Sequence, residues 1–334
     1  MASPAPLAVS LGDPAGVGPE LIAEAWARRD NERLPSFFAV GGARLLEQAA
    51  RTRGIELPVQ MIANPSEASS AFGNALPVLA GADCDYTPGA PSQAGAQVAL
   101  ASLEHATRLA LSGDAGGIVT APVAKARLAG IGFTQPGQTE YVADACDVAR
   151  EDAVMMLAGP SLRTVPITIH EALADVPRLL TTELIVRRAR VVALAMARDF
   201  GLERPRLALC GLNPHAGEEG RFGDEEARII APAIAMLRAE GLDVTGPHPA
   251  DTLFAPHERA RYDVALAMYH DQALIPIKAL DFDQGVNVTL GLPIVRTSPD
   301  HGTAFAISGT NTADPGALCA ALRMAAECAA RRAA

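Results

Sequence analysis

Short apolar segments alternate with helix-like segments along this chain, and this alternation limits the fold more than any other feature. Leu7–Leu11, Phe37–Val40 and Gly117–Thr120 are apolar runs of the length and composition of buried strands. Ala43–Arg53 and Ala94–Leu111 contain few helix breakers and are predicted helices. Strands that alternate with helices predict a parallel sheet covered by helices.

The second half of the chain continues this alternation. The predicted strands there are Ala153–Leu157, Arg163–Thr168, Arg206–Cys210 and Asp263–Met268, and the predicted helices are Thr181–Asp199, Asp224–Glu240 and Pro315–Arg332. Residues 74–92 hold many turn formers and are predicted to form an irregular connection. The fold class is therefore α/β.

The composition is that of a globular protein and argues against nucleic acid as the main partner. The 334 residues are 49% hydrophobic and 20% charged, enough for one large domain or two smaller ones. The formal net charge is −10, whereas binding to a phosphate backbone needs a basic surface. A small phosphorylated ligand needs only a local group of Lys, Arg and backbone N–H groups, so it stays compatible.

The cysteines and the hydropathy pattern favour the cytoplasm. The five cysteines are widely spaced and form no C-x-x-C pair, so neither a disulfide framework nor a cysteine zinc site is predicted. Reduced thiols are typical of the cytoplasm. The first residues show no signal-peptide pattern, and no apolar stretch approaches the ~18 residues that a membrane span requires. We therefore expect a cytoplasmic protein that binds no membrane.

Three histidines follow predicted strands. His170, His215 and His270 each stand at or just beyond the end of one. Ligands of open α/β sheets bind outside the carboxyl ends of the strands, so the three imidazoles could share one edge of the sheet. Two interpretations stay open. Each histidine is a separate loop or core residue, or together they form an open site for Zn²⁺ or a similar divalent ion.

The segment from Tyr262 to Gly309 holds an unusual number of chemically capable side chains. Set beside glycines, prolines and short apolar runs are His270, Lys278, Asn287, Arg296, Asp300 and His301. Because Arg binds an anion as a fork and Lys as a point charge, Lys278, Asn287 and Arg296 are a candidate anion site. Surface salt links are the alternative for each of them taken alone.

Three loops are further candidates. Gly12–Glu20 leaves a strand and opens a helix, but it is not the G-x-G-x-x-G fingerprint of dinucleotide binding. It is therefore either a tight strand–helix turn or a ligand loop of another kind. Gln138 and Thr139 lie in a polar loop that opens a helix, and Asp251 lies in a turn-rich loop.

Taken together and in order, these segments resemble the family of 4-hydroxythreonine-4-phosphate dehydrogenases of pyridoxal phosphate biosynthesis. The segments that carry the resemblance are Gly12–Glu20, Thr120–Pro122, Pro136–Glu140, Leu212–Gly217, Pro249–Thr252, Tyr269–Gln272 and Arg296–Ala304. They span nearly the whole chain. The Gly18-Pro19-Glu20 opening is also similar to that of the isocitrate and isopropylmalate dehydrogenases, whose fold the family shares.

The resemblance implies a particular architecture. It implies two α/β domains with an interdomain cleft, as in the isocitrate and isopropylmalate dehydrogenases. We expect residues 1–130 with 297–334 to form the first domain. Residues 131–296 would form the second, which would carry the metal and dimer-interface residues. The resemblance also implies a homodimer with shared active sites.

The resemblance also implies roles for particular residues. His170 and His215 of one subunit, with His270 of the other, would bind one divalent ion, Zn²⁺, Mg²⁺ or Co²⁺. Substrate would be held by Gln138, Thr139, Lys278, Asn287 and Arg296. Lys278 and Asp251 would be catalytic. NAD or NADP would bind outside any Rossmann fingerprint, through Asp300, His301 and Asn311.

One position departs from the family pattern. The family commonly has His before the substrate-loop threonine, where this chain has Gln138. Glutamine keeps a hydrogen-bond donor and an acceptor but cannot carry charge or shuttle a proton.

Three functions follow from the sequence. The first is NAD-dependent oxidation of 4-phosphohydroxy-L-threonine, followed by decarboxylation. The second is metal-dependent oxidation of a related four-carbon sugar-acid phosphate or dihydrodiol dicarboxylate. The third, from another class, is non-catalytic binding of a metal or an anion.

Overall fold

The structure is a computed structural model that describes residues 5–334, which fall into two compact units. Unit 1 is formed by Met1–Val148 with Leu292–Ala334, and unit 2 by Ala149–Gly291. The domain boundaries expected from the sequence, at residues 130 and 297, both lie within unit 1. Residues 131–148 belong there because the first turn of their helix bonds to unit 1: Gln138 Nε2 donates to the Ala121 carbonyl and Thr139 Oγ1 accepts from Arg296.

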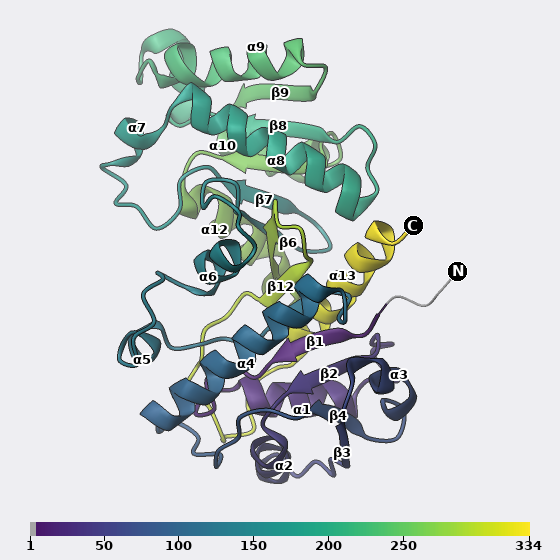
Figure 1. The fold of residues 1–334 in the computed structure, drawn as a ribbon. Helices are drawn as coiled ribbons and strands as arrows, with labels where there is room; N and C mark the ends of the chain where they lie inside the picture. The colour runs from purple at the N-terminus through teal and green to yellow at the C-terminus, as the bar shows by residue number, and fades with distance from the viewer. Residues whose placement is uncertain (1–4) are drawn as a thin grey trace. The chain divides into compact units, whose positions relative to one another are not determined.

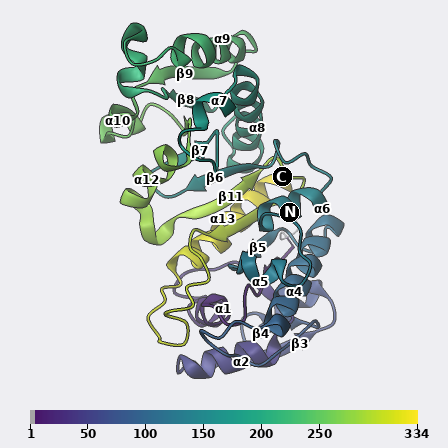
Figure 2. The ribbon, with the colours of Figure 1, turned by 90° about the vertical axis from the view of Figure 1, so that its left-hand side faces the viewer.

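Unit 1 is a parallel sheet with helices on both faces (Figure 1). Its strand order is β3-β4-β2-β1-β5-β12, and every neighbouring pair is parallel. The strands are β1 Leu7–Ser10, β2 Phe37–Val40, β3 Val59–Ile62, β4 Leu76–Leu79, β5 Ile118–Thr120 and β12 Arg296–Pro299. The helices are α1 Gly18–Ala27, α2 Ala43–Thr52, η1 Pro65–Glu67, α3 Ala68–Ala71, α4 Gln93–Ser112, α5 Lys125–Ala129, α6 Gln138–Ala145 and α13 Gly316–Arg332. Helix α4 covers one face of the strands, and α1 and α13 cover the other (Figure 2).

Unit 2 has a mixed sheet of order β11-β6-β7-β10-β8-β9. Its strands are β6 Val154–Ala158, β7 Arg163–Pro166, β8 Arg206–Cys210, β9 Asp243–His248, β10 Val264–Ala267 and β11 Val286–Leu290. Its helices are α7 Val176–Leu179, α8 Thr182–Phe200, η2 Pro214–Gly220, the π-helix η3 Glu226–Ile230, α9 Ala231–Ala239, α10 Ala250–Leu253, α11 Pro256–Arg259, α12 His270–Asp281 and η4 Phe282–Gln284. Strands β7, β10, β8 and β9 are parallel, whereas β6 is antiparallel to both of its neighbours.

The strand and helix pattern expected from the sequence is largely present, and the α/β class is confirmed. Three differences stand out. Residues 74–92 contain a strand, β4, and are not wholly irregular. The predicted helix Asp224–Glu240 begins as the π-helix η3. The predicted all-parallel sheet holds for unit 1 alone, because β6 and β7 are joined by a connection too short for a parallel crossover.

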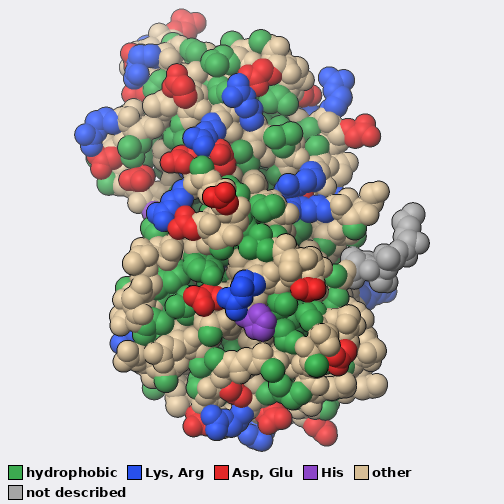
Figure 3. Space-filling model, viewed as in Figure 1, with side chains coloured by type: hydrophobic (Ala, Val, Ile, Leu, Met, Phe, Trp, Pro, Cys, Tyr) green, Lys and Arg blue, Asp and Glu red, His purple; other side chains and the backbone are tan. Residues whose placement is uncertain are grey.

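Aliphatic side chains form most of the core. In unit 2 a buried cluster centres on Leu157, Ala208, Ala265 and Ile277, with Tyr262 as its aromatic member. Charged side chains of both signs are scattered over the surface of α8 and α9 (Figure 3). Some of them form ion pairs on that surface, such as Arg190 with Glu240 at 2.6 Å. No helix within residues 5–334 is long and apolar enough to cross a membrane.

A buried group of charges joins two helices of unit 1 to a late segment of the chain. Glu20 and Glu24 lie on α1, and both are buried. Arg53, at the end of α2, has a side chain only 6% exposed and pairs with both carboxylates. It also donates to the carbonyl of Ala313 at 3.0 Å, while Glu20 accepts from the N–H of Gly309 at 3.3 Å. The group therefore holds residues 309–313 against α1 and α2.

Replacing Arg53 by Met should lower the free energy of unfolding by about 3–5 kcal/mol, because two buried carboxylates lose their cationic partner. Urea unfolding followed by circular dichroism measures this. Arg44→Met is the matched control: Arg44 lies on the same helix but pairs with Asp85 at the exposed surface, 3.5 Å away. Its replacement should cost less than about 1 kcal/mol. Equal losses in the two variants would contradict a special role for the buried group.

Candidate functional site

The carboxyl ends of β7, β10 and β8 form the edge of unit 2 on which the three histidines lie. Strand β10 pairs in parallel with both β7 and β8, so all three strands end at the same edge. His170 follows β7, His215 follows β8, and His270 is the first residue of α12 after β10. The structure thus places each of them where an open α/β sheet binds ligands.

Two of the three imidazoles lie side by side. The rings of His170 and His270 have centroids 5.7 Å apart, whereas His215 has its ring contact with Phe222, at 6.0 Å. The resemblance had paired His170 with His215 in one subunit. Within residues 5–334 no three His, Cys, Asp or Glu side chains of a single chain gather closely enough to hold a metal ion. A pair of imidazoles, rather than a complete metal site, is therefore what one chain presents.

The ring orientation of His270 suits a metal ligand. Its Nδ1 lies 2.7 Å from Oδ1 of Asp271. A carboxylate accepts hydrogen bonds, so this contact places the imidazole proton on Nδ1 and leaves the lone pair on Nε2. Histidines that bind metals are commonly oriented by such a carboxylate.

Gln272 links the strand ends that carry the histidines, and sequence reasoning gave it no role. Its Oε1 accepts from the N–H of Met268 at 2.7 Å, and its Nε2 donates to the carbonyl of Gly211 at 2.8 Å. On the other side, Thr168 Oγ1 donates to the carbonyl of Met268 at 2.8 Å. These bonds fix the end of β10 between the ends of β7 and β8. The run Tyr269-His270-Asp271-Gln272 was the available signal in the sequence.

The loop that carries His215 has an unusual backbone. His215, Ala216, Glu218 and Glu219 all have positive φ, between 41° and 57°, as does the glycine among them, Gly217. The left-handed region costs a residue with a Cβ roughly 1–2 kcal/mol. Strained backbone of this kind concentrates at functional sites, where the surrounding structure must hold it. The sequence gave no sign of this conformation.

The other predicted residues of unit 2 are more scattered. Lys278 is half-buried on α12, Asn287 lies on β11, and Asp251 is exposed on α10. The Oδ1 atom of Asn287 is buried and has no hydrogen-bond partner among residues 5–334. Buried polar atoms are nearly always paired, so an unpaired acceptor indicates a ligand or water at that point.

Arg296 is the centre of the candidate site in unit 1. Its side chain begins β12 and is fully buried; Nη2 donates to Thr120 Oγ1 at 2.9 Å and Nη1 to Thr139 Oγ1 at 3.2 Å. Burial lowers the pKa of Arg296 to about 10, and the charge of Glu140 partly offsets this. An anion beside the guanidinium would stabilise its charged form. Thr120 was not among the predicted site residues.

Gln138 adjoins this group from α6. Its Nε2 donates to the carbonyl of Ala121 at 3.0 Å, next in sequence to Thr120. Its Oε1 is buried and finds no partner in the described part of the chain. The structure therefore brings Gln138, Thr139 and Arg296 together, and the amide presents an unused acceptor.

The three predicted cofactor residues, Asp300, His301 and Asn311, lie on the segment that follows β12. This segment packs on the Gly12–Glu20 loop, where Val17 N–H donates to the Thr303 carbonyl at 3.0 Å. A Cβ on Gly16 would lie 2.7 Å from the same oxygen, so glycine is needed there for the chain to approach. The Gly12–Glu20 loop thus supports another loop of unit 1. This packing explains why residue 16 is glycine, and no phosphate ligand is needed to explain it. Nε2 of His301 is buried and lacks a partner within residues 5–334.

Known proteins that are similar to this chain point to one family. Residues 33–325 match the family model described as pyridoxal phosphate biosynthetic protein PdxA. The 4-hydroxythreonine-4-phosphate dehydrogenase of Erythrobacter litoralis is 64% identical over 98% of this chain and 98% of its own. The protein of the same name from Zymomonas mobilis is 55% identical over 98% of this chain and 96% of its own.

Solved structures give the same result. The crystal structure of 4-hydroxythreonine-4-phosphate dehydrogenase from Klebsiella pneumoniae is 37% identical and has a TM-score of 0.86, covering 98% of this chain and 99% of that one. A terephthalate 1,2-cis-dihydrodiol dehydrogenase from Burkholderia xenovorans is 29% identical, with a TM-score of 0.66 over 96% and 97% of the two chains. The resemblance carried by the sequence motifs is therefore confirmed, and the chain belongs to the PdxA family of pyridoxal phosphate biosynthetic proteins.

Proposed function

We propose that this dehydrogenase oxidises 4-phosphohydroxy-L-threonine with NAD, or NADP, in pyridoxine 5'-phosphate biosynthesis. The curated relatives that carry this activity in their names match nearly the full chain. The observation that carries the proposal is the fully buried Arg296, bound to two threonine hydroxyls beside the unpaired amide oxygen of Gln138. This arrangement suits an anionic substrate that also has hydrogen-bond donors.

The substrate offers both kinds of group. Its phosphate or carboxylate would bind Arg296 in unit 1, while Lys278 and Asn287 remain the candidate substrate residues of unit 2. Its hydroxyl or ammonium group can donate to the acceptor that Gln138 leaves unpaired in the described residues. Holding the substrate at several points fixes the reacting carbon against the nicotinamide.

The histidines of unit 2 suit a divalent metal ion in part. Two imidazoles bound to one tetrahedral ion have ring centres about 5 Å apart, close to the 5.7 Å between His170 and His270. His215, on the same edge, is the third proposed ligand. Three imidazoles favour Zn²⁺ or Co²⁺ over Mg²⁺, which prefers oxygen ligands. When bound, the ion would act as a Lewis acid toward the oxygen of the substrate's alcohol.

A homodimer would explain why one chain presents an incomplete set of ligands. Two large apolar side chains that follow His170 and His270 closely in the chain are exposed, Leu173 and Ile275, each by 65%. Exposed apolar groups that gather into one patch mark a surface that binds another protein. We infer that a second copy of the chain covers them, and that histidines of the two copies share one ion.

The cofactor would bind on the segment after β12, at Asp300, His301 and Asn311. The backbone of this segment is fixed by the Gly12–Glu20 loop and by the buried charges around Arg53. A cofactor that binds to this fixed segment would not need the glycine-rich loop of a Rossmann fold. The unpaired Nε2 of His301 is a candidate contact to the cofactor within the described chain.

The chemistry follows from the substrate and the named residues. The cofactor, when bound, would accept the hydride from the carbon that bears the hydroxyl, and Asp251 or Lys278 would accept the hydroxyl proton. The product, 2-amino-3-oxo-4-phosphobutanoate, is a β-keto acid, so it loses carbon dioxide. Lys278 is then the candidate to return a proton to the carbon that lost the carboxyl group, which gives 3-amino-2-oxopropyl phosphate.

A second substrate class is favoured by two observations. The dihydrodiol dehydrogenase from Burkholderia xenovorans shares the fold and 29% of its residues with this chain. Gln138 also stands where the family commonly has histidine. A dihydrodiol dicarboxylate or a four-carbon sugar-acid phosphate is therefore the alternative substrate.

The proposal is tested by following NADH absorbance with purified protein and 4-phosphohydroxy-L-threonine, with and without a chelator. We expect turnover that the chelator stops and added Zn²⁺ or Co²⁺ restores. His170→Ala should remove the response to added metal. Turnover with only a dihydrodiol or a sugar-acid phosphate would favour the alternative substrate, and no turnover with any of them would favour a non-catalytic protein.

Replacing Arg296 by Lys should raise the KM for the substrate roughly 10- to 100-fold, because lysine keeps the charge but cannot reach both threonines and the anion. The KM for NAD should stay near its original value. Steady-state kinetics on both substrates separates the two effects. Arg187→Lys, at an exposed pair with Asp152, is the control and should change neither constant. An unchanged substrate KM for Arg296→Lys would remove Arg296 from the substrate site.

Replacing Ile275 by Asp should convert the dimer to a monomer, because a charge would be buried in an apolar interface. Light scattering after gel filtration measures the mass. Leu194→Asp is the control, since Leu194 is 73% exposed but lies on α8. It should leave a dimer. A wild-type protein of monomer mass would contradict the shared metal site.

A further inference from the structure

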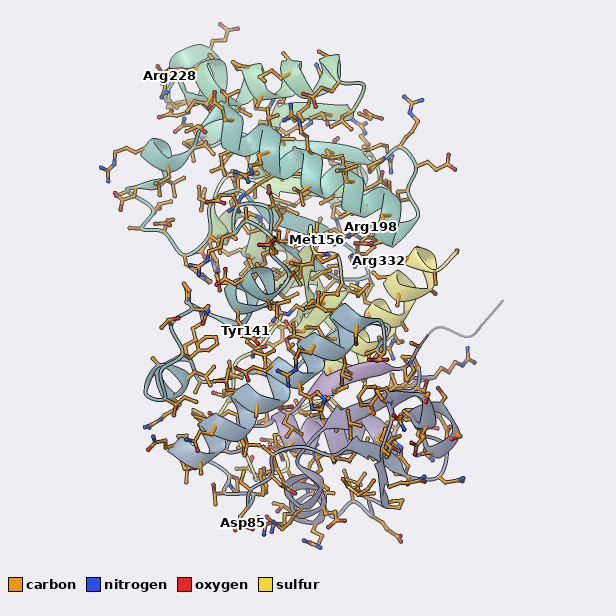
Figure 4. All side chains as sticks on the ribbon, viewed as in Figure 1. Asp85, Tyr141, Met156, Arg198, Arg228 and Arg332 are labelled. Carbon is orange, nitrogen blue, oxygen red and sulfur yellow. The ribbon has the colours of Figure 1, made fainter. Side chains whose placement is uncertain are left out.

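The loop that carries His215 has a left-handed backbone that other groups must stabilise, and the side chain of Glu226 in unit 2 is placed to do so. Glu226 is only 6% exposed and lies at the start of the π-helix η3. Figure 4 marks this turn through Arg228, which is labelled there. Short π-helical turns are uncommon and often occur at functional sites.

The Glu226 carboxylate binds the residues just before His215. Its Oε1 accepts from the backbone N–H groups of Leu212 at 2.8 Å and Asn213 at 2.7 Å. Its Oε2 accepts from Asn213 Nδ2 at 3.0 Å. Three donors on one buried carboxylate fix both the backbone and a side chain of the segment that leads into the loop.

Two glycines make room for this carboxylate. A Cβ on Gly217 would lie 2.7 Å from Glu226 Oε2, and a Cβ on Gly211 would lie 3.1 Å from Glu226 Oε1. Both glycines belong to the turn around His215, one on each side of it. The loop therefore closes around the carboxylate from both sides, and side chains at these positions would push it away.

The same segment is also fixed from the strand side. Gly211 N–H donates to the carbonyl of His248 at 2.8 Å, and the Gly211 carbonyl accepts from Gln272. Gln272 follows His270 by two residues in α12. Glu226 on η3 and Gln272 on α12 thus both bind the segment between β8 and His215. Helix α12 is also the helix that begins with His270.

We propose that Glu226 is a positioning residue for metal binding, which holds His215 in its left-handed conformation at the edge of the sheet without touching the ion. This rests on the proposed function, in which His215 is a metal ligand. We call the hydrogen bonds from Leu212 and Asn213 to the Glu226 carboxylate the clamp. Without the clamp, the loop can relax to ordinary backbone angles, and the imidazole of His215 then leaves the edge that it shares with His170 and His270.

The test compares Glu226→Gln with Asp224→Asn in the full-length protein. Glutamine has nearly the shape of glutamate but presents an NH₂ group to at least one of the three donors, so the clamp loses a bond and its charge. Asp224 lies two residues earlier, is 70% exposed and reaches Arg228 at 3.4 Å, so its replacement removes the same charge from the surface. Calorimetric titration with Zn²⁺ alone gives the affinity. Amide hydrogen exchange at Leu212 and Asn213 reports the clamp itself.

We expect Glu226→Gln to weaken Zn²⁺ binding by about 10- to 100-fold, the range seen when groups behind a metal ligand are changed. Exchange at Leu212 and Asn213 should become faster, and Asp224→Asn should change neither quantity. A purely structural role would lower the unfolding midpoint but leave the Zn²⁺ affinity of the folded protein within about two-fold of wild type, and this overturns the proposal.

Glu226→Asp keeps the charge but shortens the side chain, and it serves if Glu226→Gln does not fold. The same loss of Zn²⁺ affinity is expected, since the carboxylate no longer reaches both N–H groups. Wild-type protein that binds no Zn²⁺, Co²⁺ or Mg²⁺ would instead contradict the metal part of the proposed function. Exchange then decides the clamp alone: unchanged exchange at Leu212 and Asn213 in the variants overturns it.

Discussion

The parallel pairing of β7, β10 and β8 is the constraint on which the histidine edge of unit 2 depends. Parallel strands end at a common edge, so residues from three distant parts of the chain lie along that edge without any local motif. Thr168 and Gln272 then lock the three strand ends together through backbone groups. The rings of His170 and His270 lie side by side because their strands are neighbours and because hydrogen bonds join the ends of those strands.

The strands that end in the histidines could be predicted because each is a short apolar run followed at once by polar residues. The alternation of β-strand and helix in unit 1 was equally plain. Strands β3, β4, β9, β11 and β12 were missed, and for β3, β9 and β12 the reason is physical. Val59–Ile62 is half exposed at the edge of its sheet, Asp243–His248 contains glycine and proline, and Arg296–Pro299 is a buried but polar strand. None of them presents the apolar run on which such predictions depend.

The contacts between side chains in the candidate site could not be predicted from the sequence pattern. Arg296 was a candidate for anion binding, but only the fold brings Thr120 and Thr139 to its guanidinium. The left-handed turn at His215 depends on a carboxylate eleven residues later, and its glycines serve that carboxylate. Gln138 was singled out because it departs from the family pattern. The structure adds that its amide nitrogen is already used by the Ala121 carbonyl, so only its oxygen is available within the described chain.

Unit 1 is built from two segments of the chain, with the whole of unit 2 inserted between them. During synthesis, Ala149–Gly291 is complete and able to bury its own core before β12 and α13 have left the ribosome. Strand β5 lacks its second parallel neighbour until Arg296–Pro299 arrives, and the buried leucines of α13 come later still. The histidine edge can thus be folded before the Arg296 guanidinium of the candidate anion site has been synthesised. A nascent chain stalled before residue 292 would hold all three histidines but not Arg296.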